Sequence, residues 1–378
     1  MAKLGEVCLI NPKSCTLRDD TEVSFIPMTK VGEHGEFDAS EIKNYSEVKK
    51  GFTNFQNGDI LFAKITPCME NGKGAIAHNM KNGIGFGSTE FHVLRPDTDK
   101  ITSEWLYYLT TWKTFRKEAE RNMTGSAGQK RVPKTFLENY VVNLPDIDTQ
   151  KSENKILRKV DDLIFLRKQQ LAKLDELVKA RFVEMFLLHD YPTKTLDELS
   201  IGKGEYGAQS ASTEYNPSRP RYVRITDVND DGTLNDNCVS SENISDDAQY
   251  KLSYGDFMFA RMGATVGKTY AFLSGNQIFA GYLIRYKLNL SLVNPRYLFW
   301  YTKLDEYQTW VKLNQSGAAQ PGINAKKYGS LKIPVPPIEL QNQFATFVAR
   351  IDQQRQTVQQ SLEKLELMKK ALMQEYFG

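Results

Sequence analysis

The chain of 378 residues contains one series of short motifs twice, in the same order. The clearest pair is Gly58–Lys64 (GDILFAK) and Gly255–Arg261 (GDFMFAR). Five further pairs are Lys3–Val7 with Thr195–Leu199, Phe25–Val31 with Tyr222–Val228, Trp105–Leu109 with Tyr297–Tyr301, Ser126–Val132 with Gly317–Ile323, and Leu144–Asp148 with Val335–Glu339. Because matched positions stay roughly 191 to 197 residues apart, chance does not explain them, and we interpret the chain as two copies of one unit.

Each copy mixes strand and helix signals. The segments DILFAKI and DFMFARM are apolar, partly alternating runs introduced by a Gly-Asp turn, which is typical of β-strands. Residues 103–120 and 295–312 have helical spacing and begin with the helix-starting residues Ser103 and Pro295. The pattern therefore predicts an α+β fold for each globular part.

A long helix is expected to close each copy. Apolar residues recur every three or four positions over about four heptads, which indicates a coiled-coil seam. The first seam is Leu157, Val160, Ile164, Arg167, Leu171, Leu174, Val178, Arg181 and Met185, and the second is Val348, Ile351, Arg355, Val358, Leu362, Leu365, Lys369, Leu372 and Tyr376. Two basic residues interrupt each seam, and we expect them to reach outwards and to help set the register.

Two similar helices after two similar domains favour an antiparallel pair. Each helix of roughly 35 residues would be about 50 Å long at ~1.5 Å per residue. Parallel pairing is less favoured because the intervening domain would have to span back along the helix. We predict two similar globular domains at 1–150 and 190–341, with long helices at 151–189 and 342–378.

Composition excludes several classes of protein. The formal net charge is +3, so there is no polybasic tail, although a local basic patch is compatible with that value. The four cysteines form no C-x-x-C pair, and the four histidines are scattered, which argues against a zinc site. No secretory signal is apparent, and no apolar stretch approaches the ~20 residues of a membrane span. We expect a cytoplasmic protein.

The segment Gly263–Thr269 (GATVGKT) looks like a phosphate-binding loop but departs from its pattern. Such a loop has four residues between its glycines and opens a helix. Here three residues separate Gly263 from Gly267, and a strand-like run follows Lys268. The matching stretch around Gly72-Lys73 has the same Gly-Lys pair in a longer loop. Both copies therefore predict a β-hairpin rather than a nucleotide site.

No other catalytic constellation is present. The sequence contains no G-x-S-x-G, no H-E-x-x-H and no adenine-methyltransferase motif, although Asn294–Tyr297 resembles part of the last. Asp59 and Asp256 occupy matched positions, but each follows a glycine and precedes a strand, so a turn or capping role is favoured. We expect no catalytic residue, no metal site and no cofactor in this chain.

Basic and amide side chains instead recur in matched loops. Lysine and arginine suit phosphates and guanine, and glutamine suits the adenine edge. The candidate DNA-binding residues in the first copy are Thr29, Lys30, Lys64, Lys73, Gln129, Lys130 and Arg131. Those in the second copy are Arg219, Arg221, Arg224, Thr226, Arg261, Lys268 and Gln320. Any one of them could be an ordinary solvated residue, but the recurrence in both copies favours a binding role.

The whole chain resembles the specificity subunit of a type I restriction–modification enzyme. The resemblance rests on the paired Gly-Asp strands, on the loops Gly125–Gln129 and Gly317–Gln320, and on the run Val335–Gln341 leading into a long helix. The run Leu144–Gln150 departs from the more regular proline–acid–Gln pattern of the family.

The resemblance implies two target-recognition domains, each reading one half of a bipartite duplex DNA target. The helices would set the spacer and dock two methyltransferase subunits, and a restriction and translocation subunit would join them. S-adenosylmethionine, ATP and Mg²⁺ would be bound by those partners. The alternative from the residues alone is a bivalent, non-enzymatic scaffold for protein or glycan, which salt-dependent binding of duplex DNA would distinguish.

Overall fold

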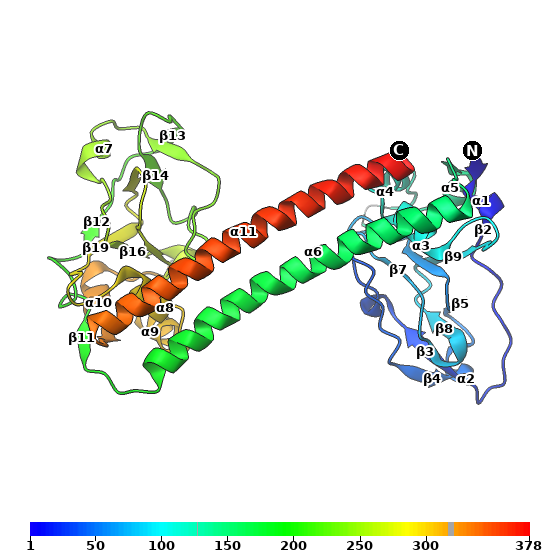
Figure 1. The fold of residues 1–378 in the computed structure, drawn as a ribbon, viewed down its shortest axis with the longest axis horizontal. Coiled ribbons are helices and arrows are strands. Elements are labelled where there is room, and N and C mark those ends of the chain that lie inside the picture. Colours follow the sequence, from blue (N-terminus) through cyan, green and yellow to red (C-terminus); the bar gives the residue numbers. More distant parts are fainter. Residues whose placement is uncertain (127, 317–320) are drawn as a thin grey trace. The chain divides into compact units, whose positions relative to one another are not determined.

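The computed structural model describes residues 1–126, 128–316 and 321–378. The chain forms two compact units (Figure 1). Unit 1 is Met1–Lys168 together with Gln360–Gly378, and unit 2 is Gln169–Gln359. The domain boundaries expected from the sequence stay predictions.

Unit 1 contains two four-stranded sheets with the orders β2-β9-β6-β7 and β4-β3-β8-β5, and a two-stranded sheet, β1-β10. Its strands are β1 (Ala2–Lys3), β2 (Cys8–Ile10), β3 (Glu22–Ile26), β4 (Ile42–Asn44), β5 (Thr53–Gln56), β6 (Ile60–Ala63), β7 (Gly74–Ile76), β8 (Ile84–Gly87), β9 (Phe91–Pro96) and β10 (Val141–Val142). Its helices are α1 (Leu4–Val7), α2 (Tyr45–Val48), α3 (Ser103–Thr111), α4 (Lys113–Arg121) and α5 (Lys134–Asn139), with 3₁₀ turns at Met28–Lys30 and Lys81–Gly83.

Unit 2 repeats the first sheet as β12-β19-β16-β17, and its other pairs are β11-β20, β13-β15 and β14-β18. Its strands are β11 (Thr193–Thr195), β12 (Glu205–Tyr206), β13 (Ser212–Glu214), β14 (Arg221–Val223), β15 (Val239–Ser241), β16 (Asp256–Ala260), β17 (Thr269–Ala271), β18 (Gln277–Phe279), β19 (Leu283–Lys287) and β20 (Lys332–Pro334). Its helices are α7 (Asp246–Gln249), α8 (Pro295–Tyr301), α9 (Asp305–Asn314) and α10 (Ala325–Gly329), with a π-helical turn at Val183–Leu187 and a 3₁₀ turn at Gly263–Thr265. The predicted α+β fold is confirmed.

The two long helices are α6 (Ile147–Phe182) and α11 (Ile338–Phe377). Within unit 1, Asp161 of α6 pairs with Lys369 at 2.5 Å, and Lys168 pairs with Glu366 at 3.6 Å. A later residue of α6 thus pairs with an earlier residue of α11. The two helices are therefore antiparallel, as predicted. Within unit 2, Phe182 contacts Phe344 at a ring-centroid distance of 5.3 Å, which is the same arrangement at the other end of each helix.

All of the predicted seam residues are buried or half-buried. The basic residues on the seam find polar partners. Arg167 Nε donates to Ser361 Oγ at 3.2 Å, and Arg355 forms ion pairs with Asp175 and Asp352. A charged group beside an apolar seam is tolerated when it is paired, and it favours one register of the two helices.

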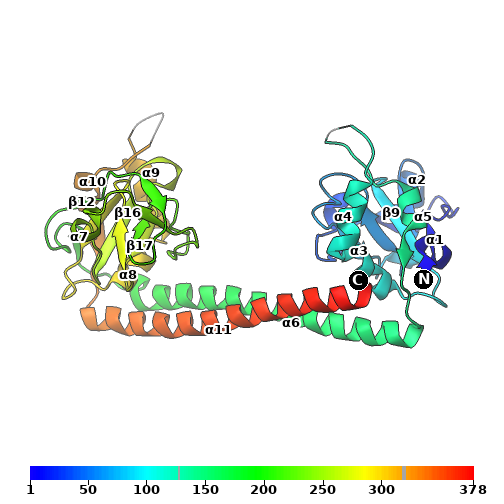
Figure 2. The same cartoon turned by 90° about the horizontal axis from the view of Figure 1, so that it is seen from above.

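An aromatic contact anchors one end of α11 in unit 1. Figures 1 and 2 both show the C-terminal part of α11, in red, beside α3 and α4. There, Phe377 lies 4.8 Å from Trp105 between ring centroids. In unit 2, Phe186 makes the matching contact with Tyr297, also at 4.8 Å. Each globular unit therefore packs an aromatic residue from the end of a long helix, or from the turn that follows it, against its own helices.

The helical segment expected over 103–120 is interrupted. α3 ends at Thr111, and Trp112 is extended with φ −63° and ψ 130° before α4 begins. The hydroxyls of Thr110 and Thr111 donate to the carbonyls of Tyr107 and Tyr108 at 2.8 Å each. Threonine hydroxyls that bond to the preceding turn weaken a helix, which accounts for the break.

Candidate nucleic-acid interface

In unit 1, three segments that are distant in sequence meet at one end of the sheet β2-β9-β6-β7. Lys64 follows β6 directly, Lys73 precedes β7, and Glu90 precedes β9. The backbone NH of Lys64 donates to Glu90 O at 2.9 Å, and the NH of Ala63 donates to Lys73 O at 3.3 Å. The sheet register therefore gathers two of the predicted lysines at a single strand end.

Unit 2 has the same arrangement with different side chains. Arg261 follows β16 and its NH donates to Tyr282 O at 3.0 Å, while the NH of Ala260 donates to Lys268 O at 2.8 Å. Tyr282 takes the position that Glu90 has in unit 1, and Arg261 takes that of Lys64. Two sites of equal backbone geometry thus present different chemistry.

A bridge that closes a loop lies next to each strand end. In unit 1, Thr124 and Arg131 form a bridge that closes the loop, and the NH of Thr66 donates to Lys130 O at 3.1 Å. Gln129 and Lys130 are exposed on it. In unit 2, Ser316 and Gly322 form the matching bridge. The predicted residue Gln320 lies outside the described residues.

The Gly-Lys hairpins have the predicted form. β17 pairs antiparallel with β16, with Phe259 opposite Thr269, so a strand and not a helix follows Lys268. Gly263 and Gly267 have φ of +71° and +86°, in the region that favours glycine, and they make the tight loop possible. The hairpin geometry lacks the helix N-terminus that a phosphate-binding loop requires.

Several predicted cations are held by neighbouring carboxylates. Arg131 donates two hydrogen bonds to Glu90, at 2.9 and 2.7 Å, and they hold the pKa of Glu90 below its usual range. Lys30 pairs with Asp38 at 2.7 Å. Lys268 pairs with the exposed Asp230 at 2.7 Å, which lowers the pKa of that carboxyl. Such partly exposed ion pairs contribute little to stability.

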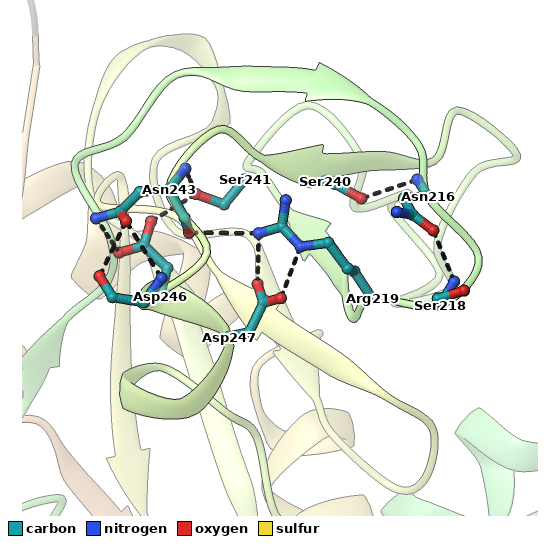
Figure 3. Close-up of polar contacts among 9 residues, drawn as sticks. Asn216, Ser218, Arg219, Ser240, Ser241, Asn243, Asp246 and Asp247 are labelled. Carbon is teal, nitrogen blue, oxygen red and sulfur yellow. Dashed lines mark hydrogen bonds and ion pairs between the residues drawn. The ribbon is translucent and has the colours of Figure 1, made fainter.

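Arg219 is fixed more firmly, as Figure 3 shows. Its guanidinium donates to both oxygens of Asp247, at 2.7 and 2.8 Å, and to Asn243 O at 3.3 Å. The same loop is closed by a hydrogen bond from Ser241 Oγ to Asp246 and by one from the NH of Asn216 to Ser240 Oγ at 3.0 Å. This arginine organises the loops around β13 and β15.

Arg221 and Arg224 also stabilise loops. Arg224 donates to both oxygens of the buried Asp227, at 3.1 and 2.8 Å. Arg221 donates to Asn235 O at 2.6 Å. In unit 1, Lys73 Nζ donates to Met28 O at 3.2 Å beside the exposed Thr29. Thr226 is exposed next to Asp227. For all of these residues, DNA binding stays a prediction.

Two residues that the sequence did not single out flank Arg261. The Arg261 guanidinium carbon lies 4.8 Å from the ring centroid of Tyr206 and 5.9 Å from that of Tyr282. Both tyrosines are partly exposed, at 39% and 55%. The internal repeat could not reveal them, because Glu90 stands opposite Tyr282 in the alignment of the two copies.

The comparison with protein families identifies the chain. The family described as type I restriction modification DNA specificity domain matches residues 1–176 and again residues 189–367. These two matches cover most of the chain, and the protein belongs to this family. Each match contains one of the two sheet-end sites described above.

Individual relatives are specificity subunits. The chain is 46% identical over 178 residues to the type I restriction enzyme EcoAI specificity subunit of Escherichia coli, covering 46% of this chain and 30% of that protein. It is 38% identical over 204 residues to the EcoEI specificity subunit of E. coli, covering 52% and 33%. The matches thus span about a third of the length of these two relatives. The putative MjaX specificity subunit of Methanocaldococcus jannaschii is 24% identical and is matched over 93% of this chain and 83% of its own.

Two solved structures share the fold. The S subunit of the type I restriction–modification system from M. genitalium gives a TM-score of 0.63 at 14% identity, covering all of this chain and 95% of that one. A chain from a study of complex assembly and conformational transition in a type I system gives 0.60 at 17% identity, covering 99% and 96%. Within the described residues, no helix is long and apolar enough to cross a membrane.

Proposed function

We propose that the chain is the DNA-specificity subunit of a type I restriction–modification complex, and that each unit reads one half of a bipartite duplex target. The observation that carries the proposal is the duplicated sheet end. In both units a strand-end cation and a Gly-Lys hairpin converge, while the side chains differ. Two units with the same backbone geometry but different side chains are suited to bind two different short DNA sequences, because base contacts supply specificity.

The complex would also need partners that this chain does not supply. We propose that two methyltransferase subunits and a restriction and translocation subunit bind it in the cytoplasm. These subunits would hold S-adenosylmethionine, ATP and Mg²⁺, and this chain would have no catalytic role. Support comes from α6, where Ile156, Leu163, Phe165 and Leu166 are 41% to 60% exposed. Apolar side chains that gather on one exposed helix segment favour a protein contact.

The test is to map methylated DNA motifs in cells that carry the chain with its cognate methyltransferase. Lys64→Ala is expected to relax the preference for bases in one half of the motif, and Arg261→Ala to relax it in the other half. Loss of a base contact corresponds to roughly 1–3 kcal/mol of discrimination. The exposed Lys117 of α4 lies outside both sites, so Lys117→Ala serves as the matched control.

Two results would contradict the proposal. If either substitution altered both halves of the motif, the assignment of one unit to one half would be wrong. If no bipartite motif were methylated in the presence of the methyltransferase, the proposed role in specificity would be wrong.

A further inference from the structure

Unit 2 ends its main sheet in a cluster of one arginine and two tyrosines, which we call the Arg261 cluster: Tyr206, Arg261 and Tyr282. Tyr206 ends β12, Tyr282 directly precedes β19, and Arg261 directly follows β16. The register places Tyr206 opposite Ile284 and Ala260 opposite Leu283, so the three residues share one end of the sheet. No carboxylate of the described residues forms an ion pair with Arg261.

The backbone holds the cluster rigidly. Arg261 NH donates to Tyr282 O at 3.0 Å, and Gly281 NH donates to Ala208 O at 2.7 Å, which ties the Tyr206 strand to the Tyr282 strand. The Tyr206 hydroxyl accepts from the NH of Ala325 at 3.2 Å. A site on strand ends with side chains fixed in this way keeps its geometry better than a free loop does.

The two rings also restrict the arginine. They lie within 4.8 and 5.9 Å of the guanidinium carbon, at cation–π distances. Arg261 Nε is buried and has no hydrogen-bond partner among the described residues. The part of the guanidinium left to meet a ligand is therefore the pair of terminal nitrogens, which donate side by side in one plane.

We infer that the Arg261 cluster reads a guanine in the half of the target bound by unit 2. A planar pair of donors matches the O6 and N7 acceptors that guanine presents in the major groove. The tyrosines would act as positioning residues that keep the plane of the Arg261 guanidinium fixed. This inference rests on the proposed function, and it goes further by naming the base.

The matching strand end of unit 1 differs from the Arg261 cluster. At the same strand end unit 1 has Lys64, and the position of Tyr282 is taken by Glu90, which pairs with Arg131. A lysine is a flexible point charge without a fixed donor plane. We therefore expect unit 2 to prefer guanine at this position. The site in unit 1 lacks the fixed donor plane that causes this preference.

The test uses the complex of the chain with its methyltransferase subunits, bound to duplexes of the motif found by mapping methylated DNA. Each guanine in the half read by unit 2 is replaced in turn by 7-deazaguanine, which lacks the N7 acceptor. Replacement of the contacted guanine by another base is expected to weaken binding roughly 5- to 150-fold, and the deaza base to produce a smaller but clear loss. In Arg261→Ala, the deaza base is expected to cause no further loss, because the interaction has already been removed.

Substitution of the tyrosines separates positioning from general stability. Tyr282→Phe keeps the ring and is expected to retain base discrimination. Tyr282→Ala is expected to reduce discrimination at that one position while affinity for unrelated DNA stays unchanged. Arg261→Lys keeps the charge and is expected to retain non-specific affinity but to lose the preference for guanine.

Three outcomes would overturn the inference. One is a half-site for unit 2 without a guanine that is sensitive to the deaza base. A second is an equal deaza effect in the wild type and in Arg261→Ala. A third is uniform weakening on all sequences in Arg261→Ala, which would assign the arginine to a backbone phosphate. In each of these cases a bipartite motif would still be methylated, so the proposed function would stand, whereas absence of any motif would remove both.

Discussion

At the residue scale, one buried glutamine near the start of each long helix forms hydrogen bonds with backbone groups. Gln150 is fully buried; its Oε1 accepts from Thr102 NH, and its Nε2 donates to Lys100 O and Pro145 O, all at 2.9 Å. Gln341 does the same in unit 2, where it accepts from Asn294 NH at 2.9 Å. Only an amide supplies both the donors and the acceptor, so the residue type follows from the geometry.

The first prediction concerns this amide. Gln150→Glu would place a carboxylate against two carbonyl oxygens in a buried site, and we expect it to lower the free energy of unfolding by roughly 2–4 kcal/mol. Denaturant-induced unfolding followed by circular dichroism measures the change. Gln354→Glu, at an exposed position of α11, is the control and is expected to have little effect. Equal stability of the two variants would show that the hydrogen bonds of Gln150 are not needed.

The sequence indicated some of the residues at the strand ends but not others. Both copies place a basic residue at the positions of Lys64 and Lys73 and of Arg261 and Lys268, and the fold brings each pair to one strand end. Their role in DNA binding stays a prediction. The sequence could not show that Arg219 and Arg224 are bound to Asp247 and Asp227, because these pairings depend on loop conformations. Nor could it find Tyr206, which lies outside every matched motif.

At the scale of elements, the helix pair is the part that the sequence determines most completely. A heptad repeat fixes which face of a helix is apolar, and the structure buries that face. The α3–α4 break was missed because side-chain hydrogen bonds of Thr110 and Thr111 override the helical spacing. The heptad pattern also does not indicate which exposed apolar residues are available to contact partner subunits.

The second prediction separates the two faces of α6. Leu157 is fully buried in unit 1, so Leu157→Ala is expected to cost roughly 2–4 kcal/mol of stability. Phe165 is 60% exposed on the same helix, and Phe165→Ser is expected to leave the unfolding transition nearly unchanged while reducing recovery of the methyltransferase subunit with the chain. Thermal unfolding and co-purification give the two readouts. Undiminished recovery with Phe165→Ser would exclude this face as the contact.

At the scale of the whole molecule, a modest net charge of +3 coexists with basic residues gathered at two strand ends. Summed charge is therefore a poor guide to DNA binding, whereas the local arrangement of cations decides where phosphates are attracted. The duplication gives each unit its own such region. One basic residue in each region pairs with a carboxylate that DNA phosphates would have to replace, Arg131 with Glu90 in unit 1 and Lys268 with Asp230 in unit 2.

The third prediction is about salt. Affinity of the assembled complex for duplex DNA should fall linearly on a plot of log K against log salt concentration. Lys130 is exposed on the unit 1 loop, and Lys130→Ala is expected to reduce the slope by about 1 and to weaken binding similarly on all sequences. Titrations by fluorescence anisotropy at several salt concentrations measure both effects. A change confined to one base position would instead make Lys130 a base reader.

Unit 1 is assembled from both ends of the chain, since Met1–Lys168 is completed by Gln360–Gly378. Phe377, which follows unit 2 in the sequence, packs on Trp105, which precedes unit 2. A ribosome makes the chain from one end, so unit 2 can close while the last helix of unit 1 is still being translated. During synthesis, the first domain therefore passes through an interval with part of its apolar surface uncovered, and such surface is prone to aggregation.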